Sequence, residues 1–348
     1  MSTFFIEFRD PLFGIIVFFA IVFVIAMASY WWNKYSSKEK SKSLDRFLND
    51  LKKTPTDKEL SLLISKGEMS EKSWILLARL YTKNGDFEKS LDIYNELLKI
   101  CDESSVKEIM YLLGSTYYKA GFLQRAEDVF LSILKTSPRT KPALRYLLLI
   151  YENKKDFQSA MDVLEPLDEL GEDISLETDY LRVLELLYNG SKTNDEKIKE
   201  LLEIYKKEKH LTYLIFEYIF RVNPKEAWNS IDATQAELII DILWRLDKGS
   251  LDFDIISKYA LLKELYSARG DISLAKKSSI FEFDVLINLD KKANADLSFE
   301  YICDNCKNIH PFAFHRCSNC HSIDTVRIEL SLSKSFQGEL SEEYNSFQ

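Results

Sequence analysis

Residues 74–97 read WILLARLYTKNGDFEKSLDIYNEL, and the order of large, small and aromatic positions in this segment returns along the chain. Its marker residues are Trp74, Leu77, Ala78, Tyr81, Gly85, Phe87, Ser90, Tyr94 and Leu97. A second unit, offset by 36 residues, has Met110, Leu113, Gly114, Tyr117, Gly121, Leu123, Ala126, Phe130, Ile133 and Pro138. A third unit, offset by 34 more, has Leu144, Leu147, Leu148, Tyr151, Phe157, Ala160, Leu164 and Leu167. A fixed period of this length indicates a repeat architecture.

The repeated pattern is similar to the tetratricopeptide repeat, in which two antiparallel helices form each unit. Large residues at helical spacing predict the buried face of each helix. Small residues such as Ala78 and Gly114 allow the two helices to approach closely. We expect Gly85, Gly121 and Gly270 to end the first helix of their units, because a left-handed backbone costs glycine little. An ordinary helical bundle would not explain the constant offset.

Further repeats are expected towards the carboxyl end. One unit recovers the spacing with Tyr259, Leu262, Tyr266, Gly270, Ile272 and Ala275. Between residues 175 and 250 helical spacing persists without the signature, as in Ile239-Ile240-Asp241-Ile242-Leu243-Trp244. We interpret this region as divergent helix pairs that continue one solenoid.

An uncharged segment near the amino terminus predicts a membrane anchor. Residues 11–33 contain no charged side chain and are long enough to cross a bilayer as a helix. Basic residues follow the segment, namely Lys34, Lys38, Lys40, Lys42 and Arg46. By the positive-inside rule, the rest of the chain then faces the cytoplasm.

The alternative is a cleaved signal peptide, since Ala26-Met27-Ala28 resembles a cleavage site. The leader has no positively charged start, and its apolar run is longer than a usual signal core, which favours the anchor.

Four of the five cysteines lie close together near the carboxyl end. Cys303 and Cys306 are separated by two residues, as are Cys317 and Cys320, with ten residues between the pairs. Two such pairs place four thiolates around one tetrahedral ion. The predicted site is therefore a closed four-cysteine centre for one zinc or iron ion, and the choice between these metals stays open.

Other interpretations of these residues remain. Two disulfides are the alternative to a metal, although a reducing compartment disfavours them. His310, His315 and His321 lie nearby and are expected to be solvated or packed rather than ligands, because four cysteines complete the site. Cys101 is interpreted as a small packed side chain. Val326, Ile328, Leu330 and Leu332 alternate with polar residues and predict a short strand.

Composition narrows the function classes. The chain of 348 residues has a formal net charge of −9, which disfavours non-specific binding to nucleic acid. It carries no phosphate-binding glycine loop, no nucleophile elbow and no paired-histidine motif. A closed four-cysteine site leaves no position for a catalytic water. We therefore expect a protein-binding scaffold and not an enzyme.

An anchor, a repeat array and a terminal cysteine module, in that order, resemble the lipopolysaccharide assembly protein B family of Gram-negative bacteria. The most specific part is Tyr301-Ile302-Cys303-Asp304-Asn305-Cys306 with Cys317-Ser318-Asn319-Cys320, which looks like the family's rubredoxin-type metal-binding domain. The resemblance implies an adaptor on the cytoplasmic face of the inner membrane. It also implies that the adaptor helps the metalloprotease FtsH degrade the deacetylase that commits precursors to lipid A.

Two positions depart from that family pattern: Lys307 stands where glycine often follows the first pair, and Ser318 where proline often lies inside the second. The resemblance therefore supports the architecture more strongly than it supports the identity of the protein that is degraded. The alternative function is a general membrane-anchored scaffold for another envelope assembly or secretion process, and the oligomeric state stays open.

The predicted fold class is all-α: a tetratricopeptide-repeat superhelix with an amino-terminal transmembrane helix and a small rubredoxin-like metal knuckle. The expected segments are an extracytoplasmic segment (1–10), the transmembrane helix (11–33), a juxtamembrane linker (34–56), the solenoid (57–295), the metal-binding domain (296–333) and a polar tail (334–348).

Overall fold

The structure is a computed structural model that describes residue 27 and residues 62–64, 69–273, 277–289 and 295–334. Apart from residue 27, the predicted membrane helix lies outside the described residues, as do the linker and nearly all of the polar tail. Among the described residues, no helix combines the length and the apolar character needed to span a membrane. The anchor stays a prediction from the sequence.

The chain divides into two compact units, residues 1–120 and 121–348. In the first unit the described helices are α3 (Glu71–Asn84), α4 (Phe87–Ile100) and α5 (Glu103–Lys119). Trp74, Ala78 and Tyr94 are buried between them, as the repeat pattern predicts. The hydroxyl groups of Thr82 and Thr116, 34 residues apart, lie 3.2 Å from each other. Equivalent positions of successive repeats thus meet in space.

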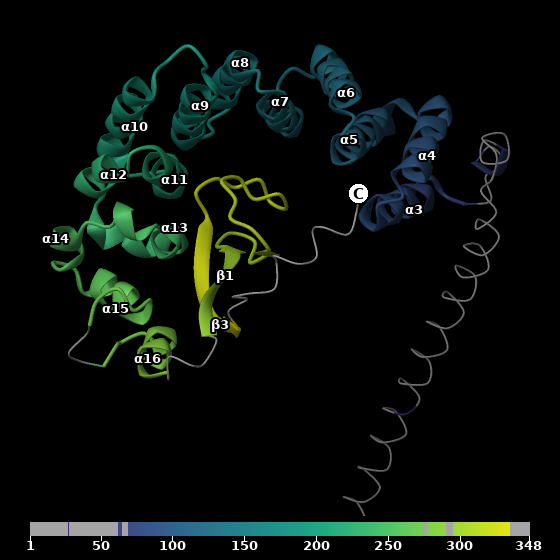
Figure 1. Ribbon diagram of the computed structural model, residues 1–348. Helices are drawn as coiled ribbons and strands as arrows, with labels where there is room; N and C mark the ends of the chain where they lie inside the picture. The colour runs from purple at the N-terminus through teal and green to yellow at the C-terminus, as the bar shows by residue number, and fades with distance from the viewer. Residues whose placement is uncertain (1–26, 28–61, 65–68, 274–276, 290–294, 335–348) are drawn as a thin grey trace, which may run out of the picture. The chain divides into compact units, whose positions relative to one another are not determined.

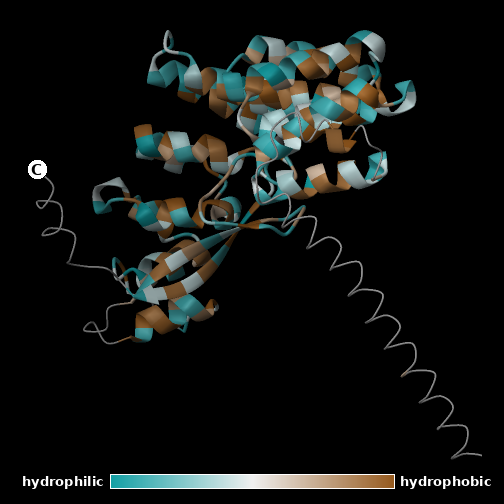
Figure 2. Cartoon of the chain, turned by 90° about the vertical axis from the view of Figure 1, so that its right-hand side faces the viewer, coloured by the Kyte–Doolittle hydropathy of each residue, from teal (hydrophilic) through white to brown (hydrophobic). Residues whose placement is uncertain are grey.

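The second unit also contains an array of helices in the described residues from 121 onward (Figure 1). Its helices are α6 (Leu123–Thr136), α7 (Lys141–Lys154), α8 (Phe157–Glu169), α9 (Ser175–Tyr188), α10 (Asn194–Glu208), α11 (Thr212–Val222), α12 (Pro224–Ser230), α13 (Ile240–Arg245), α14 (Phe253–Ile256), α15 (Ala260–Ala268) and α16 (Phe281–Asn288), with 3-10 turns η1 (Ala233–Ile239) and η2 (Lys248–Ser250). Figure 2 shows that most helices carry both hydrophobic and hydrophilic residues, as amphipathic solenoid helices do.

The glycines expected at helix ends adopt the left-handed conformation. Their φ angles are 85° at Gly85, 81° at Gly121 and 84° at Gly270, which confirms the prediction. In the third repeat Lys155 takes this position with φ of 59°, so a residue with a Cβ atom carries the strain there.

The structure of the divergent region, residues 175–250, agrees with the predicted helix pairs only in part. Helices α9, α10 and α11 are full-length, as expected for helix pairs. From residue 224 to 256 the backbone instead forms short helices and 3-10 turns. Pro224 starts one of these helices, α12, and the 3-10 turn Lys248–Ser250 lies between α13 and α14. Turn-forming residues thus replace the regular pair.

A three-stranded antiparallel sheet follows the helices, with strand order β2-β1-β3. Its strands are β1 (Ala295–Cys303), β2 (Ile309–His310) and β3 (Val326–Lys334). Cys303 pairs with Val326 and Leu297 with Leu332, so the alternating residues of β3 form one apolar face, as predicted. The fold is therefore mostly helical and tetratricopeptide-like with a small sheet at the carboxyl end, and a strictly all-α class is incomplete.

In the second unit the helices curve around this sheet (Figure 1). Strand β3 contacts η1, and both long strands contact α16. The carboxyl-terminal cysteine module is thus placed against the inner side of the curved array.

Candidate metal centre

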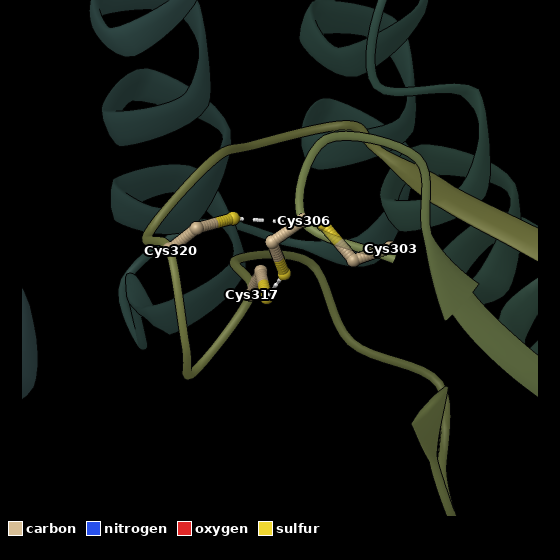
Figure 3. Close-up of side chains that lie close together, drawn as sticks. All are labelled: Cys303, Cys306, Cys317 and Cys320. Atoms are coloured by element: carbon tan, nitrogen blue, oxygen red, sulfur yellow. Dashed lines mark hydrogen bonds between the residues drawn. The ribbon is translucent and has the colours of Figure 1, made fainter. Parts of the chain in front are cut away.

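The four predicted cysteines converge at one end of the sheet (Figure 3). All four Sγ atoms lie within 4.8 Å of one another. The Sγ atoms of Cys303 and Cys320 are 3.6 Å apart, and those of Cys306 and Cys317 are 3.7 Å apart. Cys303 and Cys317 are buried, while the other two are half-buried. Residues from two separate loops therefore form one cluster.

The two cysteine loops have the same backbone geometry. In the first, Lys307 N–H donates to the Cys303 carbonyl at 2.8 Å, and Cys303 N–H donates to the Asn308 carbonyl at 3.0 Å. In the second, His321 N–H donates to the Cys317 carbonyl and Cys317 N–H to the Ser322 carbonyl, both at 2.9 Å. Each loop thus presents its two thiols in the same way, and together they close around a common centre.

This geometry explains the glycine that often follows the first pair in the family pattern. The residues that follow the pairs, Lys307 and His321, have φ angles of 58° and 61°. A left-handed backbone at these positions favours glycine, yet this chain places lysine and histidine there. The departure from the family pattern therefore leaves the loop shape intact.

Local hydrogen bonds favour the thiolate form of Cys303. Burial raises the pKa of its thiol, but backbone N–H groups of Cys306 and Asn305 and the hydroxyls of Thr325 and Ser322 outweigh it and lower the pKa to about 5. The Ser322 hydroxyl lies 3.0 Å from Cys320 Sγ, and with a backbone N–H it also lowers the pKa of that thiol against the effect of burial.

Cys317 differs from these two residues because burial dominates and raises its pKa to about 12. The cluster thus combines two thiols whose pKa is lowered with one whose pKa is raised by burial.

The spacing of the sulfur atoms fits a tetrahedral metal ion. A zinc ion with bonds of about 2.3 Å to four thiolates separates neighbouring sulfurs by about 3.8 Å. The observed 3.6 and 3.7 Å agree with this value. A disulfide would need about 2.05 Å, and all four cysteines are free thiols. The cluster is compatible with a four-cysteine metal site, and zinc and iron remain equally suitable.

The nearby histidines occupy different environments. His310 Nε2 lies 3.4 Å from Cys317 Sγ, and its ring packs on Phe314. His315 Nε2 lies 3.1 Å from Oε2 of Glu217. The ring of His321 meets the edge of Tyr146 on α7.

The fifth cysteine, Cys101, follows α4 in the first unit and is half-buried. Burial raises the pKa of its thiol.

Arg316, which precedes Cys317, anchors the cysteine module to the helices. Its Nε donates to Oε2 of Glu152 on α7 at 2.7 Å, and its guanidinium lies over the ring of Tyr180 on α9. The Tyr180 hydroxyl donates to the other oxygen of Glu152 at 3.0 Å. The two charged side chains are only 10% and 13% exposed. Burial raises the pKa of Glu152 and Arg316 opposes this rise, so the pair is a desolvated interaction.

A second buried carboxylate accepts a hydrogen bond from the first strand of the module. Asp241 on α13 is 0% exposed, and its Oδ2 accepts hydrogen bonds from Tyr301 Oη at 2.7 Å and Tyr213 Oη at 2.8 Å. Arg245, one turn along α13, donates to Tyr301 Oη at 3.2 Å. Burial raises the pKa of Tyr301 to about 12, and the bond to Asp241 adds to this rise. Strand β1 is thereby joined to α11 and α13.

Further contacts hold the loop after the second pair. Oδ2 of Asp324 accepts a hydrogen bond at 3.0 Å from the N–H of Leu211, which precedes α11. Leu211 is buried and has a φ of 58°, a costly conformation for a residue of this size. Asp324 therefore stabilises a strained backbone in the solenoid.

These anchoring residues were not identified as functional from the sequence. Glu152 and Arg316 lie far apart in the chain, and no local pattern links them. Asp241 did leave a signal, because a single charged residue interrupts the apolar run from Ile239 to Trp244. A buried charge in such a run needs partners, which the sequence does not name.

Comparisons with known proteins agree with the repeat assignment. Residues 71–103 match the family model for the tetratricopeptide repeat. The chain is 28% identical to lipopolysaccharide assembly protein B of Escherichia coli K12 over 139 residues, which cover 39% of this chain and 32% of that protein. It is 22% identical to the protein of the same name from Haemophilus influenzae over 136 residues, 38% of this chain and 33% of the relative. These findings support the resemblance to the lipopolysaccharide assembly protein B family.

The similarity is partial, because the matched segment spans about a third of the length of these relatives. The mitochondrial 15S rRNA processing factor CCM1 of Meyerozyma guilliermondii is 26% identical over 168 residues, 46% of this chain and 25% of that protein. Among solved structures, BtubC from P. vanneervenii aligns with 69% of this chain and 93% of its own, at 17% identity and a TM-score of 0.27.

Proposed function

We propose that this chain is a membrane-tethered adaptor that regulates lipopolysaccharide synthesis from the cytoplasmic side of the inner membrane. In this role it promotes degradation by FtsH of the deacetylase that commits precursors to lipid A. The partners are proteins: a membrane protease and its client. The proposal extends the similarity to lipopolysaccharide assembly protein B to the whole chain.

One observation carries the proposal. A closed four-cysteine module is held against the inner face of a tetratricopeptide-like array by buried pairs such as Arg316 with Glu152. Repeat arrays present extended surfaces to other proteins. A closed site can support shape but offers no open position for a catalytic water. The combination favours a binding protein over an enzyme.

The metal has a structural role in this proposal. Cys303, Cys306, Cys317 and Cys320 would hold one zinc or iron ion, and the ion would supply folding free energy to a module too small to form a core by itself. The chain's own residues then fix the module in place, since Tyr301 and Arg316 flank the ligands and contact the helices.

The tether is the second requirement. Residues 11–33 would confine the adaptor to the surface on which the membrane protease works, which raises its local concentration there. The basic residues after Asn33 support the cytoplasmic orientation.

The half-life of the deacetylase in a strain that lacks this gene tests the proposal. We expect the half-life to lengthen on deletion and to recover when the full chain is supplied. A chain without residues 1–33, or with Cys303→Ser and Cys317→Ser, should not restore it. An unchanged half-life would eliminate the protease-adaptor function.

The remaining candidate would then be a general membrane-anchored scaffold for another envelope process. The observation that supports this alternative is the limited span of the similarity, which covers 32% of the Escherichia coli protein.

A further inference from the structure

Helices α9 and α10 enclose a groove of about 420 Å³ that no step of the proposed function uses. The two helices lie next to each other in the second unit (Figure 1). Tyr180, which contacts Arg316, does not line the groove, whereas Arg182 two residues later does. Residues two apart on a helix point about 200° from each other. The groove therefore opens on a side of α9 that the docked cysteine module leaves uncovered.

Asp179 lines this groove with a carboxylate that accepts no hydrogen bond from any residue in the described part of the chain. Its residue is only 7% exposed. The ion-pair partner is Arg182, whose Nη1 lies 3.8 Å away, beyond hydrogen-bonding distance, and whose side chain is 58% exposed. A buried carboxylate normally accepts hydrogen bonds, because burial without them costs free energy. The Asp179 carboxylate thus lines the groove with one long ion pair, to Arg182, and no hydrogen bond from a described residue.

Apolar, acidic and basic side chains line the groove around it. Leu186 and Ile204 line the groove from opposite helices and provide an apolar floor. Glu185 and Glu203 also line it, and neither carboxylate makes an ion pair or hydrogen bond with a described residue. By contrast, the carboxylate of Glu200 at the same groove is ion-paired with Lys192, whose Nζ lies 2.6 and 2.7 Å from its two oxygens.

From these features we infer that the groove binds one basic side chain, lysine or arginine, of a partner polypeptide. Its methylene stem would lie over Leu186 and Ile204, because long basic side chains bury their stems on apolar surface. Its cationic head would donate to Asp179 and to Glu185 or Glu203, in charge-assisted bonds. Arg182 and Lys207 also line the groove, but both are exposed and able to turn towards solvent.

The inference deepens the proposed function, since it rests on the chain being an adaptor and names the chemistry of one contact. Its test uses purified components, so it can fail while the deacetylase half-life still depends on the gene. The reverse outcome would leave a basic-peptide site on a scaffold with another client.

The Ile204 methyl group provides a local probe of binding. The full chain, in detergent and labelled at isoleucine methyl groups, is titrated with acetyl-Gly-Arg-Gly-amide to about 10 mM, since a single buried side chain is expected to bind at about 1 mM. We expect a saturable shift of the Ile204 signal, identified with Ile204→Val. The same peptide with norleucine in place of arginine should leave the signal unmoved.

Variants distinguish binding in the groove from a non-specific effect of the chain's negative charge. Glu185→Gln combined with Glu203→Gln should weaken binding at least about tenfold, because hydrogen bonds to charged groups are strong. The matched control, Glu165→Gln with Glu169→Gln on the exposed face of α8, removes the same charge and should leave binding within about twofold. Asp179→Asn should weaken binding without lowering the melting temperature of the free chain. An unmoved Ile204 signal, equal binding of the norleucine peptide or equal weakening by the control pair would overturn the inference.

Discussion

Arg316 and Glu152 are 164 positions apart in the chain, yet Nε of the arginine donates to Oε2 of the glutamate at 2.7 Å. Both side chains are almost fully buried, and Tyr180 contacts both. The cysteine module and the repeat array are therefore joined by a desolvated pair rather than by surface contact alone.

Removal of Glu152 should destabilise this junction. Glu152→Ala leaves the Arg316 guanidinium buried without its carboxylate, and we expect a loss of about 3 kcal/mol in the free energy of unfolding. Urea unfolding monitored by circular dichroism measures it. The control is Glu108→Ala, which breaks the exposed pair of Arg79 and Glu108 and should cost less than about 1 kcal/mol. Similar losses in both variants would contradict a buried junction.

The metal prediction is tested by metal content. Each chain should carry one zinc or iron ion, measured by elemental analysis of purified protein. The variant with both Cys303→Ser and Cys317→Ser should lose the ion. Its cysteine module should become sensitive to protease while the repeats stay helical, because metal affinity is folding free energy in such modules. Cys101→Ser should keep the full metal content. Retention of the ion by the double variant would refute the site.

Alkaline pH should weaken the attachment of β1. An unfolded tyrosine ionises near pH 10, whereas in the folded chain burial and Asp241 raise the pKa of Tyr301 to about 12. The unfolded state therefore loses its proton first, and stability falls as pH rises from about 10 to 12. Urea midpoints across this range should decline less steeply in Tyr301→Phe. The exposed Tyr259→Phe serves as control, and a slope equal to that of the native chain in both variants would be evidence against the buried phenol.

The left-handed helix end at Gly121 predicts a simple substitution effect. No atom lies within 4 Å of the Cβ that alanine would add, so Gly121→Ala tests conformational strain alone and should cost about 1 kcal/mol. Gly190 is equally uncrowded and has no left-handed φ, so Gly190→Ala should be neutral or slightly stabilising. Thermal unfolding of both variants provides the comparison, which fails if the two changes are alike.

Topology is testable with a reporter fused after residue 348. The basic residues that follow Asn33 predict a cytoplasmic reporter and retention of residues 11–33 in the mature protein. A reporter that works only after export, or a mature amino terminus at Ser29, would refute this prediction.

The sequence predicted the features that leave a local pattern. The period near 34 residues identified helices around Trp74 and Tyr117, and the cysteine spacing identified the cluster. The docking of Arg316 on Glu152 could not be predicted, because one long-range pair leaves no periodic trace. The short helices after Pro224 were missed for a related reason: apolar runs do not show where a helix is interrupted.

The contact of Arg316 with Glu152 also sets an order of events during protein synthesis. Helix α7 emerges from the ribosome well before the cysteine loops, and at about 5–20 residues per second the delay over 164 residues is roughly 8 to 33 seconds. For that interval the carboxylate of Glu152 lacks its partner Arg316. We expect the nascent array to complete its inner side only when the tail has been translated, so a ribosome stalled before Arg316 would display an open form of the repeats.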